Sequence, residues 1–590
     1  MGIETPQAAQ PTPALTPRAR FGHWLYCLTL GLAFGTVLTF ASPPVNLWPL
    51  AALNILPLAL AAIAIARRPG RLYTGAIVTA LGTLPAWYWL HLFLFPVTGP
   101  GYVPLGFVLA SYSGFFVWLM ARWLRAVAAR PGLARVPVIL LAAGLWGLME
   151  LLRGDWVLGG YALYNVATPL IHGVAPLASI IGCIGVAAAV GGLGWMFAEL
   201  LTKPKSRRPR ALAPKLALLV LLVGLPAALV PAPAATGTRT LRVGMVQTNL
   251  PQSNKIGWSA PDRLAAFERW TALTRQAATA GAEVIVWPET MFPGQSLSPG
   301  WTAVEKQYGY YLPYKDESGR DQKLDLARFA EALVALNREL GRPLLVGAIA
   351  ADNPRRDTAT GRIASDARYN SMFLIRSGTV ETDRYDKGRL VPFGEYVPIA
   401  WRYPAIQNAV VGLGAKGMSF DLGFGTRDHV FELVSENTTA RAITPICFEM
   451  TYPMHCRDLV YRGGKRAVDV IITASNDGWF GDWDSGRSAH LLAAQWRAAE
   501  LGTPVVRSVN TGISCVIDAA GKVVSSPGSE PLGTRAEGVL VATVPLATRT
   551  TVYSYLGDWP AITLGLASLG IIAAGVFTSR SGPARTDPRG

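Results

Sequence analysis

Charged residues, cysteines and histidines are all scarce in this chain, and each shortage excludes a class of protein. Only 16% of the 590 residues are charged, whereas a soluble chain carries about 25%, which argues against an ordinary soluble protein. The five cysteines have no regular spacing and no CxxC pair, which excludes a disulfide framework and a cysteine-based zinc site. The six histidines do not cluster, so we expect no metal site.

Long apolar runs take the place of the missing charge. Hydrophobic residues make up 51% of the chain, and a helix that crosses the hydrocarbon core of a bilayer needs about 20 of them in succession. Runs of this length predict eight transmembrane helices, near residues 22–41, 46–66, 73–95, 102–122, 136–153, 175–201, 213–231 and 559–579.

Lysine and arginine distinguish the two sides of the membrane. The formal net charge is +16, and in the first 240 residues the basic residues gather in alternate gaps between the apolar runs. This positive-inside pattern predicts that both chain ends are cytoplasmic and that the block between the seventh and eighth spans lies across the membrane. That block has no basic face interleaved with aromatic residues, so nucleic acid is not an expected partner.

These patterns divide the chain into four parts. Residues 1–20 are rich in Pro, Ala and Thr and are expected to be a disordered cytoplasmic N-terminus. Residues 21–234 form the predicted membrane domain with seven transmembrane helices, and residues 551–590 hold the eighth helix and a cytoplasmic tail. In residues 235–550, apolar runs of strand length alternate with helical segments, which indicates an α/β layered domain.

Three polar residues stand beside apolar runs in that α/β block. Glu289 follows EVIVWP, Lys387 precedes GRLVPFGEYVP, and Cys447 follows ITPI. A thiol, a carboxylate and an ammonium group make a complete set for acyl transfer, because they can supply the nucleophile, the proton acceptor and the stabiliser of the oxyanion. The sequence therefore predicts one catalytic site from three distant segments.

Each of these residues also has a simpler interpretation. Cys447 could be a structural buried cysteine, or could pair with Cys456 or Cys515 in an oxidising compartment. Glu289 could be an ordinary exposed glutamate after a strand, and Lys387 a solvent-facing lysine at the start of a loop. Local sequence alone favours the simpler interpretations, so the hypothesis depends on the three residues acting together.

The order of the glutamate, the lysine and the cysteine resembles the nitrilase superfamily, whose members use these residue types on an αββα sandwich. The strings KGRLVPFGEYVP, CFE and NDGWFGD are similar to one branch, the bacterial apolipoprotein N-acyltransferases. The resemblance covers nearly the whole chain by architecture and about residues 240–517 by motif. It implies a polytopic α-helical membrane domain plus an α/β nitrilase-like αββα sandwich domain, in the bacterial inner membrane with the catalytic domain in the periplasm.

Matched motif by motif, the resemblance implies a role for each residue. Glu289 corresponds to the general base, Lys387 to the oxyanion stabiliser and Cys447 to the nucleophile. Three further residues match supporting positions of the family: Glu395, Glu449 and Trp479.

Two positions depart from the family's pattern. The family often has tyrosine after the nucleophile, where this chain has Phe448. A role for that hydroxyl is therefore absent, although the backbone N–H remains. Gly478 stands where the family has alanine, a change expected only to loosen the turn.

The resemblance also implies a reaction and its partners. An acyl group would pass from a phospholipid, with phosphatidylethanolamine expected, to Cys447 as a thioester and then to the N-terminal diacylglyceryl-cysteine of an apolipoprotein. The donor is already an activated ester, so no cofactor is expected, and we expect a monomer. Two alternatives stay open: a membrane-tethered nitrilase-type amidase acting on small amides, and a membrane scaffold or transporter that retains an inactive hydrolase domain.

Two insertions are candidates for lids over the site. Residues 398–411 contain Ile399, Trp401 and Tyr403, and because Trp and Tyr favour bilayer interfaces we predict a substrate lid here. Three glycines follow as candidate hinges: Gly412, Gly414 and Gly417. The second insertion, residues 293–323, is either another lid or a surface decoration. Its aromatic residues are Trp301, Tyr308, Tyr310 and Tyr311.

Overall fold

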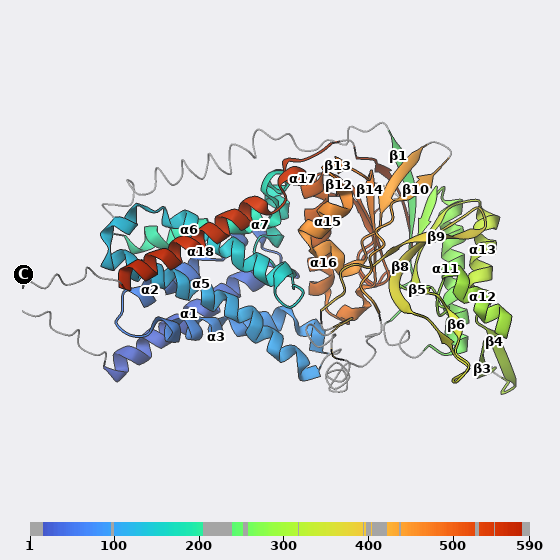
Figure 1. Ribbon diagram of the computed structural model, residues 1–590, viewed down its shortest axis with the longest axis horizontal. Coiled ribbons are helices and arrows are strands. Elements are labelled where there is room, and N and C mark those ends of the chain that lie inside the picture. The colour runs from blue at the N-terminus through green and yellow to red at the C-terminus, as the bar shows by residue number, and fades with distance from the viewer. Residues whose placement is uncertain are drawn as a thin grey trace, which may run out of the picture.

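The chain folds into a bundle of helices joined end to end with an α/β sandwich (Figure 1). The computed structural model describes residues 16–95, 99–203, 239–251, 258–316, 318–392, 394–396, 403, 422–435, 438–524, 530–547 and 549–580. Within these ranges the helical half comes from the two ends of the chain, and the sandwich comes from the middle.

The helical half contains long apolar helices. Those described are α1 (Pro17–Ala41), α2 (Leu56–Ala66), α3 (Leu72–Leu90), α5 (Val103–Ala129), α6 (Val138–Leu151), α7 (Ile171–Thr202) and α18 (Trp559–Arg580). In the part of the chain that the structure describes, five segments are long and apolar enough to cross a membrane: Pro17–Ala41, Trp48–Ala66, Val103–Ala129, Thr168–Thr202 and Trp559–Thr578. These segments identify a membrane protein.

The sequence located most of these helices but not all their ends. The helix α1 begins at Pro17, where the Thr16 side chain accepts a hydrogen bond from the Ala19 N–H. Residues 17–20 are therefore helical, where disorder was expected. Proline suits the first turn of a helix and the threonine caps it. The predicted span at 213–231 lies outside the described residues.

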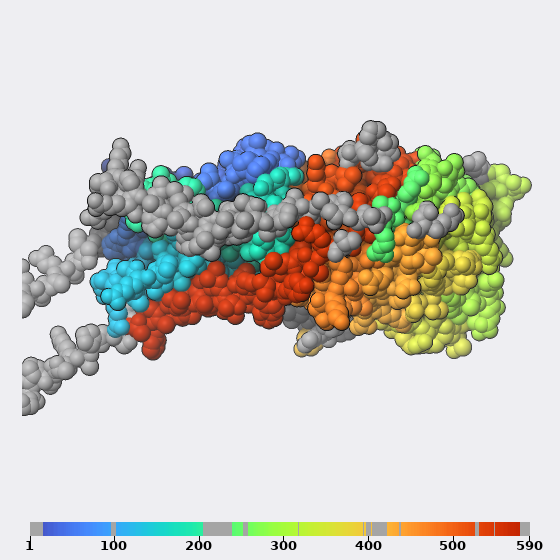
Figure 2. All heavy atoms as spheres, turned by 90° about the horizontal axis from the view of Figure 1, so that it is seen from above, coloured from blue at the N-terminus to red at the C-terminus, as the bar shows by residue number. Residues whose placement is uncertain are grey.

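The C-terminal helix packs on helices from the first part of the chain. Figure 2 shows α18, in red, running along the flank of the helical half as far as the sandwich. It packs against α6 and α5, and Gly144 allows a close approach because a Cβ there would lie 2.5 Å from the Leu564 carbonyl oxygen. Small residues let membrane helices pack closely.

Two six-stranded sheets form the centre of the sandwich. The first has the order β18 (Gly538–Pro545), β1 (Thr240–Gln247), β2 (Val284–Val286), β5 (Leu344–Asp352), β8 (Ala367–Arg376) and β9 (Thr379–Asp386). The second has the order β10 (Phe431–Val434), β11 (Thr439–Ile443), β14 (Val470–Ser475), β15 (Val505–Val509), β16 (Cys515–Ile517) and β17 (Val523–Val524). In each sheet three adjacent strands are parallel, β1–β2–β5 and β11–β14–β15, and the flanking pairs are antiparallel.

The sheets pack face to face, and helices cover their outer faces. Val243 of the first sheet and Ile472 of the second belong to one buried apolar cluster between the sheets. On the far side of the first sheet, α11 (Ala260–Thr279) and α13 (Arg328–Leu340) bury Trp270 and Phe329 in a second cluster. The predicted αββα sandwich is confirmed, since α15 (Pro453–Val460) and α16 (Asp484–Leu501) complete the fourth layer (Figure 1).

The outer face of α16 packs on the membrane helices instead of facing water. Trp496 is 1% exposed, and its indole N–H donates to the carbonyl of Thr168, 2.9 Å away. The Cys183 backbone N–H donates to the buried carboxylate of Glu500 at 2.7 Å. The two halves therefore share one apolar core with specific hydrogen bonds across it.

The second insertion is a surface decoration. It forms α12 (Pro299–Tyr308), β3 (Tyr311–Lys315) and β4 (Asp321–Asp325), which lie at the end of the sandwich farthest from the membrane helices (Figure 1). Trp301 is buried and donates to Glu305 of the same helix at 2.8 Å.

Candidate functional site

Strand ends bring the three predicted catalytic residues into one cavity. Glu289 follows β2, Lys387 follows β9, and Cys447 is the first residue of a 3-10 turn, η10 (Cys447–Thr451), after β11. Parallel sheets bind ligands at the carboxyl ends of their strands. The site is built at that edge of both sheets.

Lys387 forms two buried ion pairs. Its Nζ lies 3.0 Å from Glu289 Oε1 and 2.9 Å from Glu395 Oε1, and the lysine is 1% exposed. Burial opposes the charge, but the carboxylates of Glu289 and Glu395 outweigh it and raise the pKa of Lys387 well above its usual range. The ammonium is therefore a fixed positive charge inside the site.

Glu289 is held by three donors, so its orientation is fixed. Oε1 accepts from Lys387 and from Asn370 Nδ2 at 2.7 Å, and Oε2 accepts from the Asn476 backbone N–H at 2.9 Å. Asn370 lies on β8 and Asn476 directly follows β14. Both sheets thus position the carboxylate that can accept a proton.

Cys447 is a neutral thiol held in a constrained backbone conformation. Its φ is +54°, a region that costs energy for a residue with a side chain and that marks functional sites. Burial and the negative charge of Glu289 raise the pKa of the thiol well above its usual range, although Lys387 acts in the opposite sense. Nucleophilic attack therefore requires a base, and Glu289 lies in the same cavity.

Glu449 connects the lysine loop to the cysteine turn. Its carboxylate accepts from the backbone N–H groups of Gly388 at 2.8 Å, Arg389 at 3.0 Å and Ile446 at 2.7 Å. The Tyr385 hydroxyl and His455 also bond to it. Burial opposes ionisation, but these hydrogen bonds lower the pKa of Glu449. The ionised carboxylate is a structural clamp between the residues next to Lys387 and Cys447.

We expect Glu449→Gln to weaken both stability and catalysis. The amide cannot accept every bond, so at pH 7 unfolding should become easier by about 2–3 kcal/mol and the rate should fall at least about tenfold. Because the folded-state pKa of Glu449 lies below 4.5, its contribution is present above that pH and is lost as the pH falls through the lower value. Thermal unfolding in detergent should show a difference from wild type that shrinks below pH 4.5. A difference that is constant with pH would contradict this role.

An apolar cavity of about 260 Å³ opens over the three residues. Its floor is polar and includes Glu289, Lys387, Cys447 and Glu395. Its other wall comes from the membrane half, and on α5 the lining residues are Leu105, Val108, Leu109 and Tyr112. The geometry combines acyl-transfer groups with a lining suited to hydrocarbon.

The supporting residues take different places in this cavity. Phe448 is 6% exposed, and its ring packs 6.0 Å from Tyr161 of the membrane half. Trp479 lines the cavity from the 3-10 turn η11 (Asp477–Phe480). Phe480 meets Phe93 edge to face at 4.9 Å, so the NDGWFGD segment also joins the two halves.

The predicted lid is mostly outside the described residues. Ile399, Trp401 and the three candidate hinge glycines fall there, and Tyr403, which is described, is 58% exposed. Among the described residues there is no group of three His, Cys, Asp or Glu side chains that could hold a metal ion.

Several functional residues escaped the sequence analysis. Asn370 and Asn476 both bond to Glu289. Asparagine within a strand gives no catalytic signal by itself, so Asn370 was missed, and Asn476 was seen only as part of the NDGWFGD string, without a role. Tyr161 lines the cavity, and its hydroxyl has no hydrogen-bond partner within the described ranges. That Tyr161 lines the cavity can be seen only once the membrane helices and the sandwich are placed against each other.

Comparisons with known proteins agree with this architecture. The carbon-nitrogen hydrolase family model matches residues 242–553, and the model of the apolipoprotein N-acyltransferase N-terminal domain matches residues 34–196. The apolipoprotein N-acyltransferase of Azotobacter vinelandii is 30% identical over 92% of this chain and 93% of its own length. That of Bradyrhizobium diazoefficiens is 30% identical over 72% and 71%.

A solved amidase from Nesterenkonia sp. also matches 52% of this chain and 90% of its own, with 18% identity and a TM-score of 0.33. The relatives that match along most of the chain, together with the two family models, confirm the resemblance drawn from the motifs. This chain belongs to the apolipoprotein N-acyltransferase family.

Proposed function

We propose that this protein moves an acyl chain from a membrane phospholipid to the N-terminal diacylglyceryl-cysteine of apolipoproteins, through a thioester on Cys447. One observation carries the proposal: the Glu–Lys–Cys set forms the floor of an apolar cavity whose opposite wall belongs to membrane helices. A hydrocarbon chain that packs against that wall would place the ester carbonyl to which it is attached over Cys447. The names of the relatives support N-acylation of lipoproteins.

The first half-reaction forms the acyl-enzyme. Glu289 takes the proton from Sγ of Cys447 as the sulfur attacks the ester carbonyl. The Lys387 ammonium and the Phe448 backbone N–H stabilise the resulting oxyanion, and one such donor is worth about 3–4 kcal/mol. Collapse of the tetrahedral intermediate breaks the C–O bond, and the leaving alkoxide takes the proton from Glu289. A lysophospholipid and a thioester remain.

The second half-reaction uses the same residues, with Cys447 now as the leaving group. The neutral α-amine of the diacylglyceryl-cysteine attacks the thioester carbonyl, and Glu289 takes a proton from its nitrogen. The C–S bond breaks, the thiolate recovers that proton, and an amide is released. The apolar lining favours the amine over water as acceptor because it keeps bulk water out of the cavity.

The donor and the location follow from the same proposal. We infer phosphatidylethanolamine as the donor and the bacterial inner membrane as the site, with the sandwich on the periplasmic side. The orientation is supported by the basic residues that gather in alternate gaps between the apolar runs. The donor and the membrane are inferred from membership of the apolipoprotein N-acyltransferase family. Glu289, Lys387 and Cys447 act as base, oxyanion stabiliser and nucleophile, and Glu395, Phe448, Glu449 and Trp479 support them.

The test is a reconstitution in liposomes. Wild-type protein is mixed with acyl-labelled phosphatidylethanolamine and a diacylglyceryl-cysteine peptide, and the products are analysed by mass spectrometry. We expect the peptide to gain one acyl chain, and in the absence of peptide we expect a hydroxylamine-sensitive label on the protein. Ammonia release from small amides without any phospholipid dependence would support the amidase alternative and contradict the proposal.

A further inference from the structure

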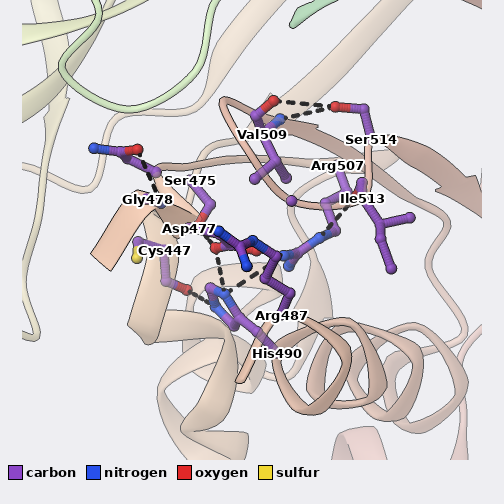
Figure 3. Close-up of polar contacts among 12 residues, drawn as sticks. Cys447, Ser475, Asp477, Gly478, Arg487, His490, Arg507, Val509, Ile513 and Ser514 are labelled. Carbon is purple, nitrogen blue, oxygen red and sulfur yellow. Dashed lines mark hydrogen bonds and ion pairs between the residues drawn. The ribbon is translucent and has the colours of Figure 1, made fainter. Parts of the chain in front are cut away.

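A buried charged cluster lies directly behind the nucleophile. Asp477 and His490 are each 1% exposed and Arg507 is fully buried. His490 Nε2 lies 2.8 Å from the backbone carbonyl oxygen of Cys447, and its Nδ1 lies 3.0 Å from Asp477 Oδ1. Arg507 Nη2 donates to Asp477 Oδ2 at 2.6 Å, and the Ser475 hydroxyl donates to Oδ1 at 2.7 Å (Figure 3).

The main partners of His490 are both hydrogen-bond acceptors. A carboxylate and a peptide carbonyl only accept hydrogen bonds, so Nε2 is placed to donate to the Cys447 carbonyl while Nδ1 faces the Asp477 carboxylate. Asp477 stays ionised. Burial opposes its ionisation, but the positive charges of Arg507 and His490 outweigh burial and lower its pKa. Arg507 Nη2 lies 3.5 Å from Nδ1 as well, and is directed to the same carboxylate.

The carbonyl that His490 holds belongs to a functionally important peptide. The Cys447–Phe448 peptide is trans, so its C=O and its N–H point in opposite directions. In Figure 3 the carbonyl oxygen of Cys447 points at His490 and the sulfur lies on the other side of the residue. The Phe448 N–H is therefore directed to the side of the sulfur. As the second residue of η10, Phe448 has no acceptor for this N–H inside the turn.

We propose that Asp477 and His490 are positioning residues that set and polarise the Cys447–Phe448 peptide, so that its N–H binds the oxyanion of the acyl-transfer intermediates. A donor on the carbonyl, itself in contact with the Asp477 carboxylate, withdraws electron density from the peptide and strengthens its N–H as a donor. It also holds Cys447 at its positive φ. His490 takes no part in the proton transfers, and the inference rests on the proposed acyl-enzyme.

The arrangement separates His490 from Lys387 in function. Lys387 supplies a charge through its own side chain and is tied to the base. His490 lines the same cavity, but its ring nitrogens contact the Cys447 carbonyl and Asp477, so its polar contact with the nucleophile is through the main chain. Loss of His490 should therefore affect steps that create an oxyanion and spare steps that need only the sulfur.

Two reactions of the same cysteine distinguish this role from a merely structural one. Acylation by phospholipid passes through an oxyanion, whereas alkylation by iodoacetamide is a displacement at carbon and forms none. For His490→Ala we expect acylation to slow by about 10²-fold, with the KM for phospholipid changed less than about twofold and alkylation of Cys447 less than about threefold. His490→Gln keeps a neutral donor and should lie between the two, at about tenfold slower acylation. His429→Gln, which changes a histidine that packs on Phe431, is the matched control and should behave as wild type.

Three results would overturn the inference. His490→Ala acylated within threefold of wild type would show that the bond is not needed. Equal losses of acylation and alkylation in His490→Gln would show that the histidine only holds the cysteine in place. A wild type that takes no acyl group would overturn the proposed function and this inference together, whereas the first two results leave the proposed function intact.

Discussion

Replacing Cys447 by serine will abolish the acyl-enzyme and lower N-acyl transfer by at least about 10³-fold. A hydroxyl is far less acidic than a thiol, and burial together with the charge of Glu289 already raises the pKa of the thiol in this cavity. The same burial disfavours an alkoxide even more strongly. Glu289 can deprotonate sulfur during attack, but it is too weak a base for oxygen.

The measurement is labelling of the protein by acyl-labelled phospholipid, followed by hydroxylamine. Cys515→Ser is the matched control, because Cys515 is also a buried, free cysteine of the sandwich and lies on β16. This control should retain the label, and Cys447→Ser should carry none. Equal labelling of Cys447→Ser and wild type would eliminate Cys447 as the nucleophile.

Replacing Lys387 by methionine should reduce both activity and stability. The ammonium is the cation of two buried ion pairs, so its removal takes away the positive charge that balances the carboxylates of Glu289 and Glu395. Breaking a buried pair in this way costs about 3–5 kcal/mol, and losing an oxyanion donor lowers the rate about 10²–10³-fold. The pKa of Lys387 is raised, so its stabilising contribution is fully present at neutral pH and is lost only as the pH rises through a value above 10.5.

A second substitution separates the two effects. In Lys387→Met/Glu395→Gln one of the two carboxylates is neutral, so a large part of the lost thermal stability should return while activity stays low. Thermal unfolding in detergent and the rate of peptide acylation measure the two quantities. Recovery of activity in the double variant would show that Lys387 acts only as a counter-ion for the glutamates.

The sequence carried the predictions for Glu289 and Cys447 because each follows an apolar run of strand length, and the prediction for Lys387 because of the segment GRLVPFGEYVP that follows it. The strand before Lys387, β9, has no continuous apolar run. The outer strands β10 and β17 are too short to be recognised from an apolar run. Their pairing is imposed by the neighbouring strands, which a local pattern cannot show.

The cavity wall was beyond sequence reasoning for a different reason. Leu105, Val108 and Leu109 are apolar residues such as any membrane helix contains, and only the tertiary structure shows that they line the same cavity as Cys447. His490 likewise looks like an ordinary helical histidine until β14 and η10 are placed beside it. In both cases the information lies in contacts between segments far apart in the chain.

Because residues of both halves line the cavity, the membrane helices do more than anchor the chain. If they served only as an anchor, the sandwich alone would contain a finished enzyme, like a soluble hydrolase on a tether. Here the sandwich expressed by itself would contain the reactive groups but lose the wall formed by α5 and the contacts of Phe448 with Tyr161. The helical half is therefore part of the cavity that holds the reactive groups, as well as the membrane anchor of the chain.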